Sequence, residues 1–486
     1  HLQWEISNIN YTSSTRLKKI KRKFLVSPNP VVDKYTVVFQ VGKIIVQNKK
    51  NNVIPLLPAL NGCSFPCFLW SPIGGRCTHY NAPLIMGTLV GDRVRCPIHG
   101  ACFNVKTGDI EDYPGLDCLV KSFIICCSQS LKLTKRMKEM CTVNPDVKHI
   151  ILLVGGGPAS LVCAETLRQN CYQGRIIIVT KDNLPPFDKP KLSKVRNFIQ
   201  NSILLRQHDF YQQHGIEMWM GKEVVSVNSA DKVVQMSDGT SQLSHPETCP
   251  LQCPGSDLKG VHLLQSYADA KEIHASSLGK RAVVIGASFI GMEAASYLSD
   301  KAASVALVGP TKYPFENSLG PEIGKMTMEE KKVKFVMNNK VTEIRGENGK
   351  VIQFLLTNVA DVFSAGDVAS FPLTIRGDQR VNIGHWQMSH AHGRVAALNM
   401  LNKPTTIESV PFFWSALAGK SIRYAGYGEG YTEIIIKGKL EERKFVALYI
   451  KDEVVVAAAS MAFEPAVSRV ADLLDQGRAI TKTQAQ

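Results

Sequence analysis

The chain has 486 residues, of which 44% are hydrophobic, and this length is typical of three or four domains with substantial cores. No stretch reaches the ~18 to 20 uninterrupted apolar residues of a membrane-spanning helix. The 13 cysteines lack a regular even spacing, which excludes a small disulfide scaffold and fits a reducing compartment. The 57 Lys and Arg against 42 Asp and Glu give a net charge of +15, which favours acidic or phosphorylated partners.

Residues 1–34 form a basic flanking segment that we place outside the first domain. Within it, residues 16–23 contain six cations in eight positions. Such a run is typical of a nuclear signal, an anionic-lipid contact or a nucleic-acid patch, and a solvated flanking segment is the simpler alternative. No basic motif interleaved with aromatic residues supports nucleic-acid binding. Because the chain begins at His1, we expect a fragment or processed product that has lost any targeting signal.

Two stretches rich in valine and isoleucine, residues 36–40 and 43–47, predict β-strands. Residues 51–72 then contain four prolines, and we expect an inserted loop there. Cys63 and Cys67 in this loop are a weak candidate for a metal or redox pair, because no second pair accompanies them.

One cysteine and one histidine lie on each of two predicted loops: Cys77 with His79, and Cys96 with His99. Two thiolates on one iron and two imidazoles on the other are the ligands of a [2Fe–2S] centre whose potential exceeds that of an all-cysteine cluster. The alternative is a tetrahedral zinc site, which uses the same residue types. Zinc fingers usually separate a cysteine pair from a histidine pair, so the mixed pairs favour the iron–sulfur cluster.

Residues 77–84 and 95–104, followed by 107–109, resemble a Rieske ferredoxin. High-potential Rieske loops carry an extra cysteine each, and Ala82 and Ile98 occupy those positions here. The resemblance therefore implies a ferredoxin-type centre at the lower end of the Rieske potential range, able to accept electrons from a reduced flavin. We interpret Cys102 as a packing residue. A strand at 120–126 should close this domain before a linker at 135–147.

A buried strand, a glycine turn and a helix are predicted over residues 149–167, followed by a second strand at 175–180. This order is the context that a dinucleotide-binding fingerprint requires. The three fingerprint positions allow a tight turn, close approach of the pyrophosphate and close packing of the helix. They are Gly155, Gly157 and Ser160, the last replacing the usual glycine. Asp182 is the candidate to bind the ribose hydroxyls.

The same pattern recurs over residues 281–308. Its fingerprint positions are Gly286, Ser288 and Gly291. The second strand ends at Gly309, where a ribose-binding acid is expected, so the sequence leaves NADH and NADPH open. Glu293 is placed near the nicotinamide. Two fingerprints in the correct strand–helix context predict paired Rossmann domains.

Three further segments resemble the ferredoxin-reductase flavoproteins. Residues 187–194 match an aromatic-X-Arg-Pro-Pro-Leu-Ser-Lys segment, which implies that Lys189 and Lys194 contact the flavin nucleotide. Residues 362–367 resemble a strand-end motif, which implies that Asp367 bonds the FAD ribityl chain. A helix that begins near Trp386 should direct its N-terminus at the flavin ring and stabilise the reduced form.

The order of these segments resembles the Rieske-containing apoptosis-inducing-factor-like flavoproteins of the ferredoxin-reductase-type FAD/NAD(P) oxidoreductase family. We therefore predict a multidomain α/β plus β protein with an N-terminal Rieske β domain, two Rossmann-like FAD and NAD(P) domains and a C-terminal α+β domain. The expected boundaries are 35–134 for the Rieske domain, 148–270 and 357–410 for the FAD-binding domain, 271–356 for the NAD(P)-binding domain and 411–486 for the C-terminal reductase domain.

Two pieces expected from the resemblance are absent. The family has a buried strand that ends in Ala-Thr-Gly. Residues 243–255 of this chain contain three prolines instead, and proline is not found in a central strand. The connection at 357–361 is also much shorter than a βαβ unit of ~30 residues. The sequence is therefore either a divergent member with impaired cofactor binding or an imperfect gene reading, and the intact flanking motifs favour the second.

The resemblance implies an oxidoreductase that passes electrons from NAD(P)H through FAD to the Rieske [2Fe–2S] cluster, with an unidentified acceptor beyond it. No catalytic side chain is required for this electron transfer. A pro-apoptotic role and a mitochondrial location, with the cytoplasm second, follow from the resemblance alone. The alternative is a catalytically impaired member that acts as a cell-death signalling or interaction protein.

Overall fold

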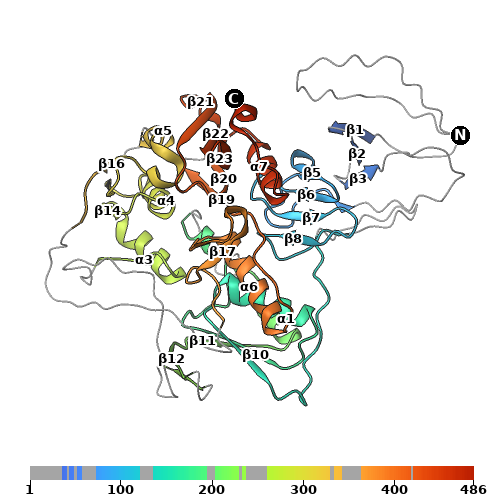
Figure 1. The fold of residues 1–486 in the computed structure, drawn as a ribbon. Coiled ribbons are helices and arrows are strands. Elements are labelled where there is room, and N and C mark those ends of the chain that lie inside the picture. Colours follow the sequence, from blue (N-terminus) through green and yellow to red (C-terminus); the bar gives the residue numbers. More distant parts are fainter. Residues whose placement is uncertain are drawn as a thin grey trace, which may run out of the picture.

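The computed structural model describes residues 73–120, 135–193, 203–228, 233–236, 260–328, 333–341, 363–417 and 420–486, together with three strands before residue 57. Four parts follow one another along the chain and contact each other (Figure 1). Lys194, Cys63, Cys67 and the predicted strand at 120–126, apart from its first residue, lie outside the described residues, as do the two segments where pieces of the family are absent.

The N-terminal part contains two antiparallel sheets. The first has the order β1-β2-β3-β4, formed by Tyr35–Gln40, Lys43–Asn48, Asn52–Leu56 and Ile73–Gly74. The second has the order β5-β6-β7-β8, formed by Thr88–Val90, Arg93–Arg95, Cys102–Asn104 and Ile110–Asp112, and η1 (Leu84–Met86) precedes it. Strand β3 shows that the prediction of a loop over all of 51–72 was wrong. Val53 and Ile54 favour a strand and pair with β2, and this pairing outweighs the proline signal.

The next part is a parallel three-stranded sheet in the order β11-β10-β9, with α1 and α6 packed against each other beside it (Figure 1). Its elements are β9 (Ile150–Val154), α1 (Pro158–Gln169), β10 (Arg175–Thr180), η2 (Lys189–Lys191), α2 (His208–Gln213) and β11 (Ile216–Met220). A hairpin of β12 (Val224–Asn228) and β13 (Val233–Met236) follows. The strand–turn–helix–strand order predicted from the sequence is confirmed, because apolar runs here fill a sheet that helices cover.

A second parallel sheet has the order β14-β15-β16 and the same local plan. Its elements are α3 (Tyr267–Ser277), β14 (Arg281–Ile285), α4 (Phe289–Leu298), β15 (Ser304–Val308), α5 (Glu316–Met328) and β16 (Val333–Val336). Gly320, with φ 83°, interrupts the helical backbone of α5 one residue before Pro321.

The chain then returns to the first parallel sheet. This segment contains β17 (Phe371–Leu373), η4 (Thr374–Arg376), β18 (Gln379–Val381) and α6 (Trp386–Met400). The strand expected to end at Asp367 is absent from 363–367, the described part of that segment. Asp367 lies instead in a turn, where its carbonyl accepts from the Asn382 side-chain amide at 2.8 Å and not from the backbone of any described strand.

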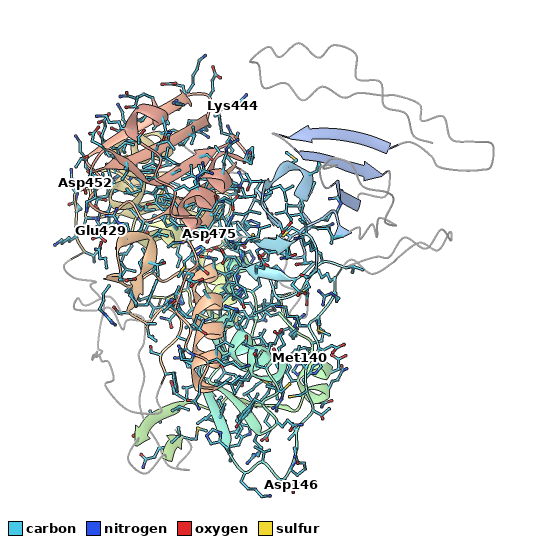
Figure 2. The ribbon with its side chains drawn as sticks, turned by 45° about the vertical axis from the view of Figure 1, so that its right-hand side comes forward. Met140, Asp146, Glu429, Lys444, Asp452 and Asp475 are labelled. Atoms are coloured by element: carbon cyan, nitrogen blue, oxygen red, sulfur yellow. The ribbon has the colours of Figure 1, made fainter. Side chains whose placement is uncertain are left out.

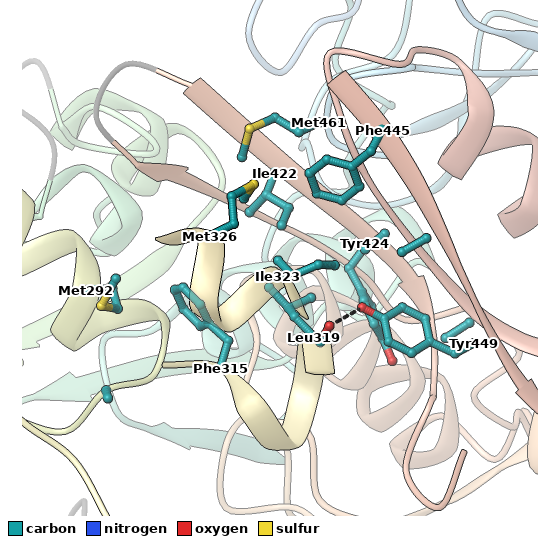
Figure 3. Packing of buried hydrophobic residues seen from close by; sticks show 14 of the residues in the cluster. Met292, Phe315, Leu319, Ile323, Met326, Ile422, Tyr424, Phe445, Tyr449 and Met461 are labelled. Atoms are coloured by element: carbon teal, nitrogen blue, oxygen red, sulfur yellow. Dashed lines mark hydrogen bonds between the residues drawn. The ribbon is translucent and has the colours of Figure 1, made fainter. Parts of the chain in front are cut away.

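The C-terminal part is a five-stranded antiparallel sheet in the order β19-β20-β23-β22-β21, with α7 and α8 after it. Its elements are β19 (Phe412–Leu417), β20 (Lys420–Gly426), β21 (Glu433–Lys439), β22 (Lys444–Lys451), β23 (Val454–Met461), α7 (Ala466–Asp475) and α8 (Lys482–Ala485). The core of this sheet continues into the second parallel-sheet part, where Leu319 and Ile323 of α5 pack against it (Figure 3). The Tyr449 hydroxyl donates to the Leu319 carbonyl at 2.9 Å, so the two parts share one core.

In the part of the chain that the structure describes, the helices are too short or too polar to cross a bilayer.

Candidate functional site

The two cysteine–histidine loops have the same backbone plan. In each loop, the backbone amide of the cysteine donates to the carbonyl of the residue five positions later in the chain. The backbone carbonyl of the same cysteine accepts from the amide of the residue four positions later. These bonds, 2.8 to 3.2 Å long, join Cys77, Asn81 and Ala82 in the first loop and Cys96, Gly100 and Ala101 in the second. Asn81 and Gly100 have φ values of 59° and 81°, a left-handed conformation that asparagine and glycine adopt most readily. The sequence therefore folds both loops around equivalent turns.

The four candidate ligands converge at one end of the β5–β8 sheet. The rings of His79 and His99 have centroids 5.0 Å apart. The Cys77 and Cys96 thiols are hydrogen bonded, which raises the pKa of Cys77 well above its usual value and lowers that of Cys96. Burial lowers the pKa of His79 to about 3, so its imidazole is neutral. His79 Nδ1 has no hydrogen-bond partner among the described residues. A neutral imidazole with an open nitrogen and a pair of thiols is a donor set that fits a mixed-ligand cluster.

The donor set is arranged as pairs and not around one point. Within the described ranges, no three His, Cys, Asp or Glu side chains surround a position as the ligands of a single ion do. A Rieske [2Fe–2S] cluster needs only two protein ligands on each iron, whereas structural zinc takes four. The arrangement of Cys77 and Cys96 as one pair and His79 and His99 as another matches the first requirement.

Aromatic side chains connect this centre to the neighbouring domains. Trp414, on β19, has its ring 4.3 Å from His99, 5.7 Å from His79 and 5.3 Å from His385 by centroid distances. His385 is the N-cap of α6 and accepts from the Gln387 amide at 3.3 Å. One tryptophan ring therefore contacts both candidate ligand histidines and the N-cap of α6. Sequence reasoning missed Trp414, because no local pattern shows that β19 passes between the two domains.

A second link joins the first ligand loop to the flavin-type segment at 187–194. The Tyr80 hydroxyl donates to Asp188 Oδ2 at 2.6 Å, and Asp188 is buried. Lys191 forms an ion pair with the same Asp188 oxygen at 3.4 Å. Burial raises the pKa of Tyr80 far above its usual value, and the Asp188 charge adds to this effect. The phenol therefore stays protonated and continues to donate.

The first glycine turn has the space that a dinucleotide requires. Gly155 has φ 103°, and a Cβ at Gly155 or Gly157 would meet no described atom within 4 Å. A Cβ at Gly156 would lie 2.5 Å from Thr180 Oγ1, so this glycine is needed for close packing of the turn on β10. Ser160 lies half-buried on the first turn of α1. Pyrophosphate oxygens bind well at such an open helix N-terminus.

Asp182 and Lys189 lie close enough for their charges to interact. The Asp182 amide donates to Thr180 Oγ1 at 3.1 Å, which fixes the carboxylate just past β10. Burial raises the pKa of Asp182, while the positive charges of Lys189 and Lys181 oppose that shift. The structure thus brings these two predicted nucleotide ligands together.

Asp367 contacts α6, which packs against α1. Ser389 Oγ donates to Asp367 Oδ1 at 3.1 Å, which turns the exposed carboxylate toward the helix start. A Cβ at Gly393 would lie 2.2 Å from the Ala159 carbonyl oxygen, so the absence of a side chain lets α6 approach α1. Trp386 is buried and packs against His390, with centroids 5.1 Å apart.

The second glycine turn also has free space beside its first glycine, Gly286. Gly286 has φ 109°, and a Cβ there would meet no described atom within 4 Å, whereas a Cβ at Gly291 would lie 1.8 Å from the Gly286 carbonyl oxygen. Ser288 is the exposed N-cap of α4. A Cβ at Gly309 would lie 2.7 Å from Ala287 Cβ, so no acidic side chain fits there. Close packing explains the missing ribose acid.

Glu293 connects three parts of the chain. Its carboxylate accepts from Ser193 Oγ at 2.6 Å, from Ser415 Oγ at 2.7 Å and from the Ala416 amide at 3.3 Å. Ser193 belongs to the flavin-type segment, and Ser415 lies next to Trp414 on β19. The predicted nicotinamide-side acid therefore lies where the flavin-type and nicotinamide-type parts meet the C-terminal sheet.

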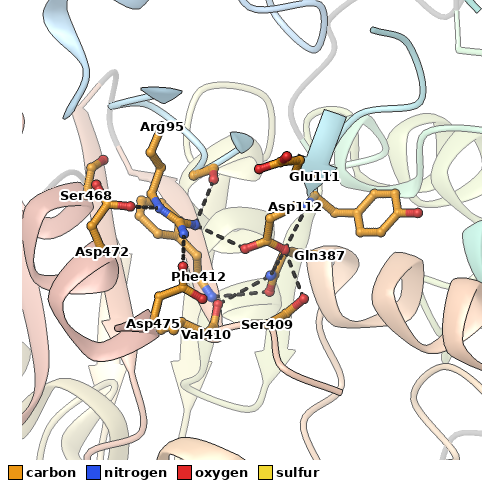
Figure 4. A network of polar contacts seen from close by, with 12 residues as sticks. Arg95, Glu111, Asp112, Gln387, Ser409, Val410, Phe412, Ser468, Asp472 and Asp475 are labelled. Carbon is orange, nitrogen blue, oxygen red and sulfur yellow. Dashed lines mark hydrogen bonds and ion pairs between the residues drawn. The ribbon is translucent and has the colours of Figure 1, made fainter. Parts of the chain in front are cut away.

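A buried polar network holds the β5–β8 sheet against the rest of the molecule (Figure 4). Arg95, 1% exposed, pairs with Asp112 at 3.1 Å and with Asp472 of α7 at 2.5 Å. Gln387 of α6 donates to Asp112 Oδ1 at 3.4 Å and accepts from the Phe412 amide at 3.2 Å. Asp475, at the end of α7 and labelled in Figure 2, is a third carboxylate beside Arg95, at 3.5 Å. Sequence reasoning missed these residues as well.

Comparison with known protein families agrees with this geometry. Residues 70–124 match the Rieske [2Fe-2S] domain, residues 149–357 the pyridine nucleotide-disulphide oxidoreductase family, and residues 412–486 the reductase C-terminal family. Apoptosis-inducing factor 3 of Mus musculus is 41% identical over 482 residues, covering 85% of this chain and 80% of the relative. The Homo sapiens protein of the same name is 40% identical over the same length.

Solved structures of ferredoxin reductases share the fold. One from Rhodopseudomonas palustris has a TM-score of 0.61 at 21% identity, and covers 69% of this chain and 96% of its own. The chain is an NAD(P)H:acceptor oxidoreductase, and its cofactors are FAD and a Rieske [2Fe–2S] cluster, with NAD(P)H as the electron donor. It belongs to the Rieske-containing apoptosis-inducing-factor-like flavoproteins, of the ferredoxin-reductase type of FAD- and NAD(P)-dependent oxidoreductases.

Proposed function

We propose that this chain passes electrons from NAD(P)H through FAD to its own Rieske cluster, so that the N-terminal domain serves as a built-in ferredoxin. The observation that supports this most directly is the position of Trp414, whose ring contacts both His99, at 4.3 Å, and His385, the N-cap of α6, at 5.3 Å by centroid distances. Among similar proteins, one from Pseudomonas putida, 24% identical, is named the ferredoxin–NAD(+) reductase subunit of a benzene 1,2-dioxygenase system. Here the two functions share one polypeptide.

Each cofactor has candidate residues in this chain. FAD converts a two-electron donor into one-electron steps when bound, and the protein supplies binding and orientation. We assign to FAD the residues Gly155, Gly157, Ser160, Asp182, Lys189, Lys194, Asp367 and Trp386. We assign to NAD(P)H the residues Gly286, Ser288, Gly291 and Glu293, and to the cluster Cys77, His79, Cys96 and His99.

The domain boundaries follow the same assignment. We place the Rieske domain at 35–134, the two parts of the FAD-binding domain at 148–270 and 357–410, the NAD(P)-binding domain at 271–356 and the reductase domain at 411–486. The sheet topology supports this division, because β9–β11, β14–β16 and β19–β23 form three separate sheets that fall in the FAD-binding, NAD(P)-binding and reductase domains.

Stopped-flow reduction of the loaded full chain by NADH and by NADPH tests the proposal. His99→Ala should abolish the Rieske EPR signal and leave flavin absorbance and its bleaching unchanged. Trp414→Leu should keep both the signal and flavin bleaching but slow cluster reduction by about tenfold or more. His149→Ala, a change of an exposed histidine, is the control and should behave like the wild type. Equal cluster reduction in Trp414→Leu and wild type would contradict the proposed route.

Membership of this family supports a mitochondrial location, or a cytoplasmic one, and a role in cell death. Fractionation of cells that express the full-length protein, together with survival of cells expressing His99→Ala, tests both. Survival that depends on His99 would connect the role to electron transfer.

A second candidate function is that of a signalling or interaction protein without turnover. It is supported by the two departures of the sequence from the family pattern, at residues 243–255 and 357–361. The flavin content of the purified chain distinguishes the two functions, because a protein that binds no FAD cannot reduce its cluster from NAD(P)H.

A further inference from the structure

The second ligand loop is held by the C-terminal domain as well as by its own sheet. Arg423, on β20, donates from Nε to the Ile98 carbonyl at 3.1 Å, and Ile98 lies between Cys96 and His99. Ser468, on α7, donates to the Cys96 carbonyl at 3.2 Å. Both donors come from the end of the chain, more than 300 residues after the loop. The C-terminal domain therefore determines part of the environment of the cluster.

Arg423 is a buried cation beside this loop. It is 7% exposed, and burial lowers its pKa while the nearby Cys96 sulfur opposes that shift. Its guanidinium pairs with Glu464, whose side chain is 21% exposed. Arg423 is thus the charge that β20 presents to the cluster, and a single carboxylate partly balances it.

The other buried arginine at this loop is balanced differently. Arg95 donates to the Gly100 carbonyl at 3.2 Å, but three carboxylates surround its guanidinium. They belong to Asp112, Asp472 and Asp475. Arg95 and its three carboxylates together carry a net negative charge, whereas Arg423 and Glu464 form a one-to-one pair in which the Nε side of the cation faces the ligand loop.

We propose that Arg423 is a positioning residue that raises the reduction potential of the Rieske cluster, and that Glu464 moderates its effect. This inference rests on the assignment of Cys77, His79, Cys96 and His99 as cluster ligands. Reduction adds one negative charge to the cluster, and a cation in a region of low dielectric stabilises that charge more than it would in water. Hydrogen bonds and charges around an iron–sulfur cluster are known to set its potential. The C-terminal domain thereby adjusts the cluster to accept electrons from the flavin.

A redox titration of the loaded full chain, followed by the Rieske EPR signal, tests the proposal with three variants. Arg423→Met should lower the ratio of reduced to oxidised cluster at a fixed potential by about tenfold, which is 59 mV for one electron. Arg423→Lys keeps the charge and should recover most of that loss. Glu464→Gln should shift the ratio in the opposite direction, an outcome that general destabilisation does not produce.

Arg136→Met is the matched control, because Arg136 pairs with Asp109 on a loop that holds no ligand. It removes the same charge from a position just after the Rieske domain, away from both ligand loops, and should leave the potential unchanged. If Arg423→Met fails to load a cluster, Glu464→Gln still decides the question, since it leaves the bond from Arg423 to Ile98 in place.

An intact Rieske signal with unchanged potential in both Arg423→Met and Glu464→Gln would overturn the role of Arg423 and leave the cluster assignment standing. Absence of a Rieske signal from the iron-loaded wild type would overturn the cluster assignment, and with it this inference.

Discussion

Replacing Arg95 by leucine should loosen the Rieske domain from the reductase. The Arg95 side chain bridges Asp112 of its own sheet and Asp472 of α7, at 3.1 and 2.5 Å, and is 1% exposed. Leucine fills part of the volume but leaves both carboxylates without a cation in a buried region. Removing one partner of a buried ion pair costs about 3–5 kcal/mol, because the remaining charge is uncompensated.

Urea unfolding measures this loss of stability. The visible circular dichroism of the bound cluster reports the unfolding of the Rieske domain itself. With a slope of about 2 kcal/mol/M, a loss of 3–5 kcal/mol lowers the midpoint by about 1.5–2.5 M. The double variant Arg95→Leu with Asp472→Asn should recover part of the loss, since it removes one of the orphaned charges. Arg136→Leu removes a more exposed ion pair and should shift the midpoint by less than about 0.5 M.

A midpoint for Arg95→Leu within about 0.5 M of the wild type would refute the reasoning, provided that the slope is unchanged. It would show that water or a local rearrangement satisfies the carboxylates. The Rieske domain would then be held to the reductase by packing alone.

Two further predictions concern the reductase part. Gly291→Ala should raise the Kd for NAD(P)H by about tenfold or more, because its Cβ would lie 1.8 Å from the Gly286 carbonyl oxygen and displace α4 from the turn. Fluorescence titration measures this Kd, and unchanged FAD content is the internal control. Burial holds the pKa of His390 at about 3, below its usual 6.5, so the unfolded chain binds a proton that the folded chain does not. The stability that this histidine contributes is present above pH 6.5 and is lost as the pH falls toward 3, by up to about 1.4 kcal/mol per pH unit. His390→Phe should therefore flatten the loss of stability between pH 7 and 4 in urea titrations, and an unchanged slope would contradict this.

Local sequence was sufficient for the parallel-sheet parts. The strands at 150–154, 175–180 and 281–285 are short apolar runs between a turn and a helix, and the structure forms each one there. The two ligand loops were also recognisable, since their chemistry depends on residues a few positions apart. The prediction was wrong where local signals conflicted. At β3, the prolines indicated a loop, whereas the neighbouring valine and isoleucine favour the strand that forms.

The sequence by itself was enough to propose which side chains bind the cofactors, because cysteine–histidine loops and glycine turns are built from neighbouring residues. Only the tertiary structure decided how the cofactor sites are joined. Trp414, Gln387 and Arg423 come from the last hundred residues and meet loops that lie hundreds of positions earlier. Such contacts depend on how whole domains pack, and each arises from the summed burial and pairing at an interface, which no short stretch of sequence encodes.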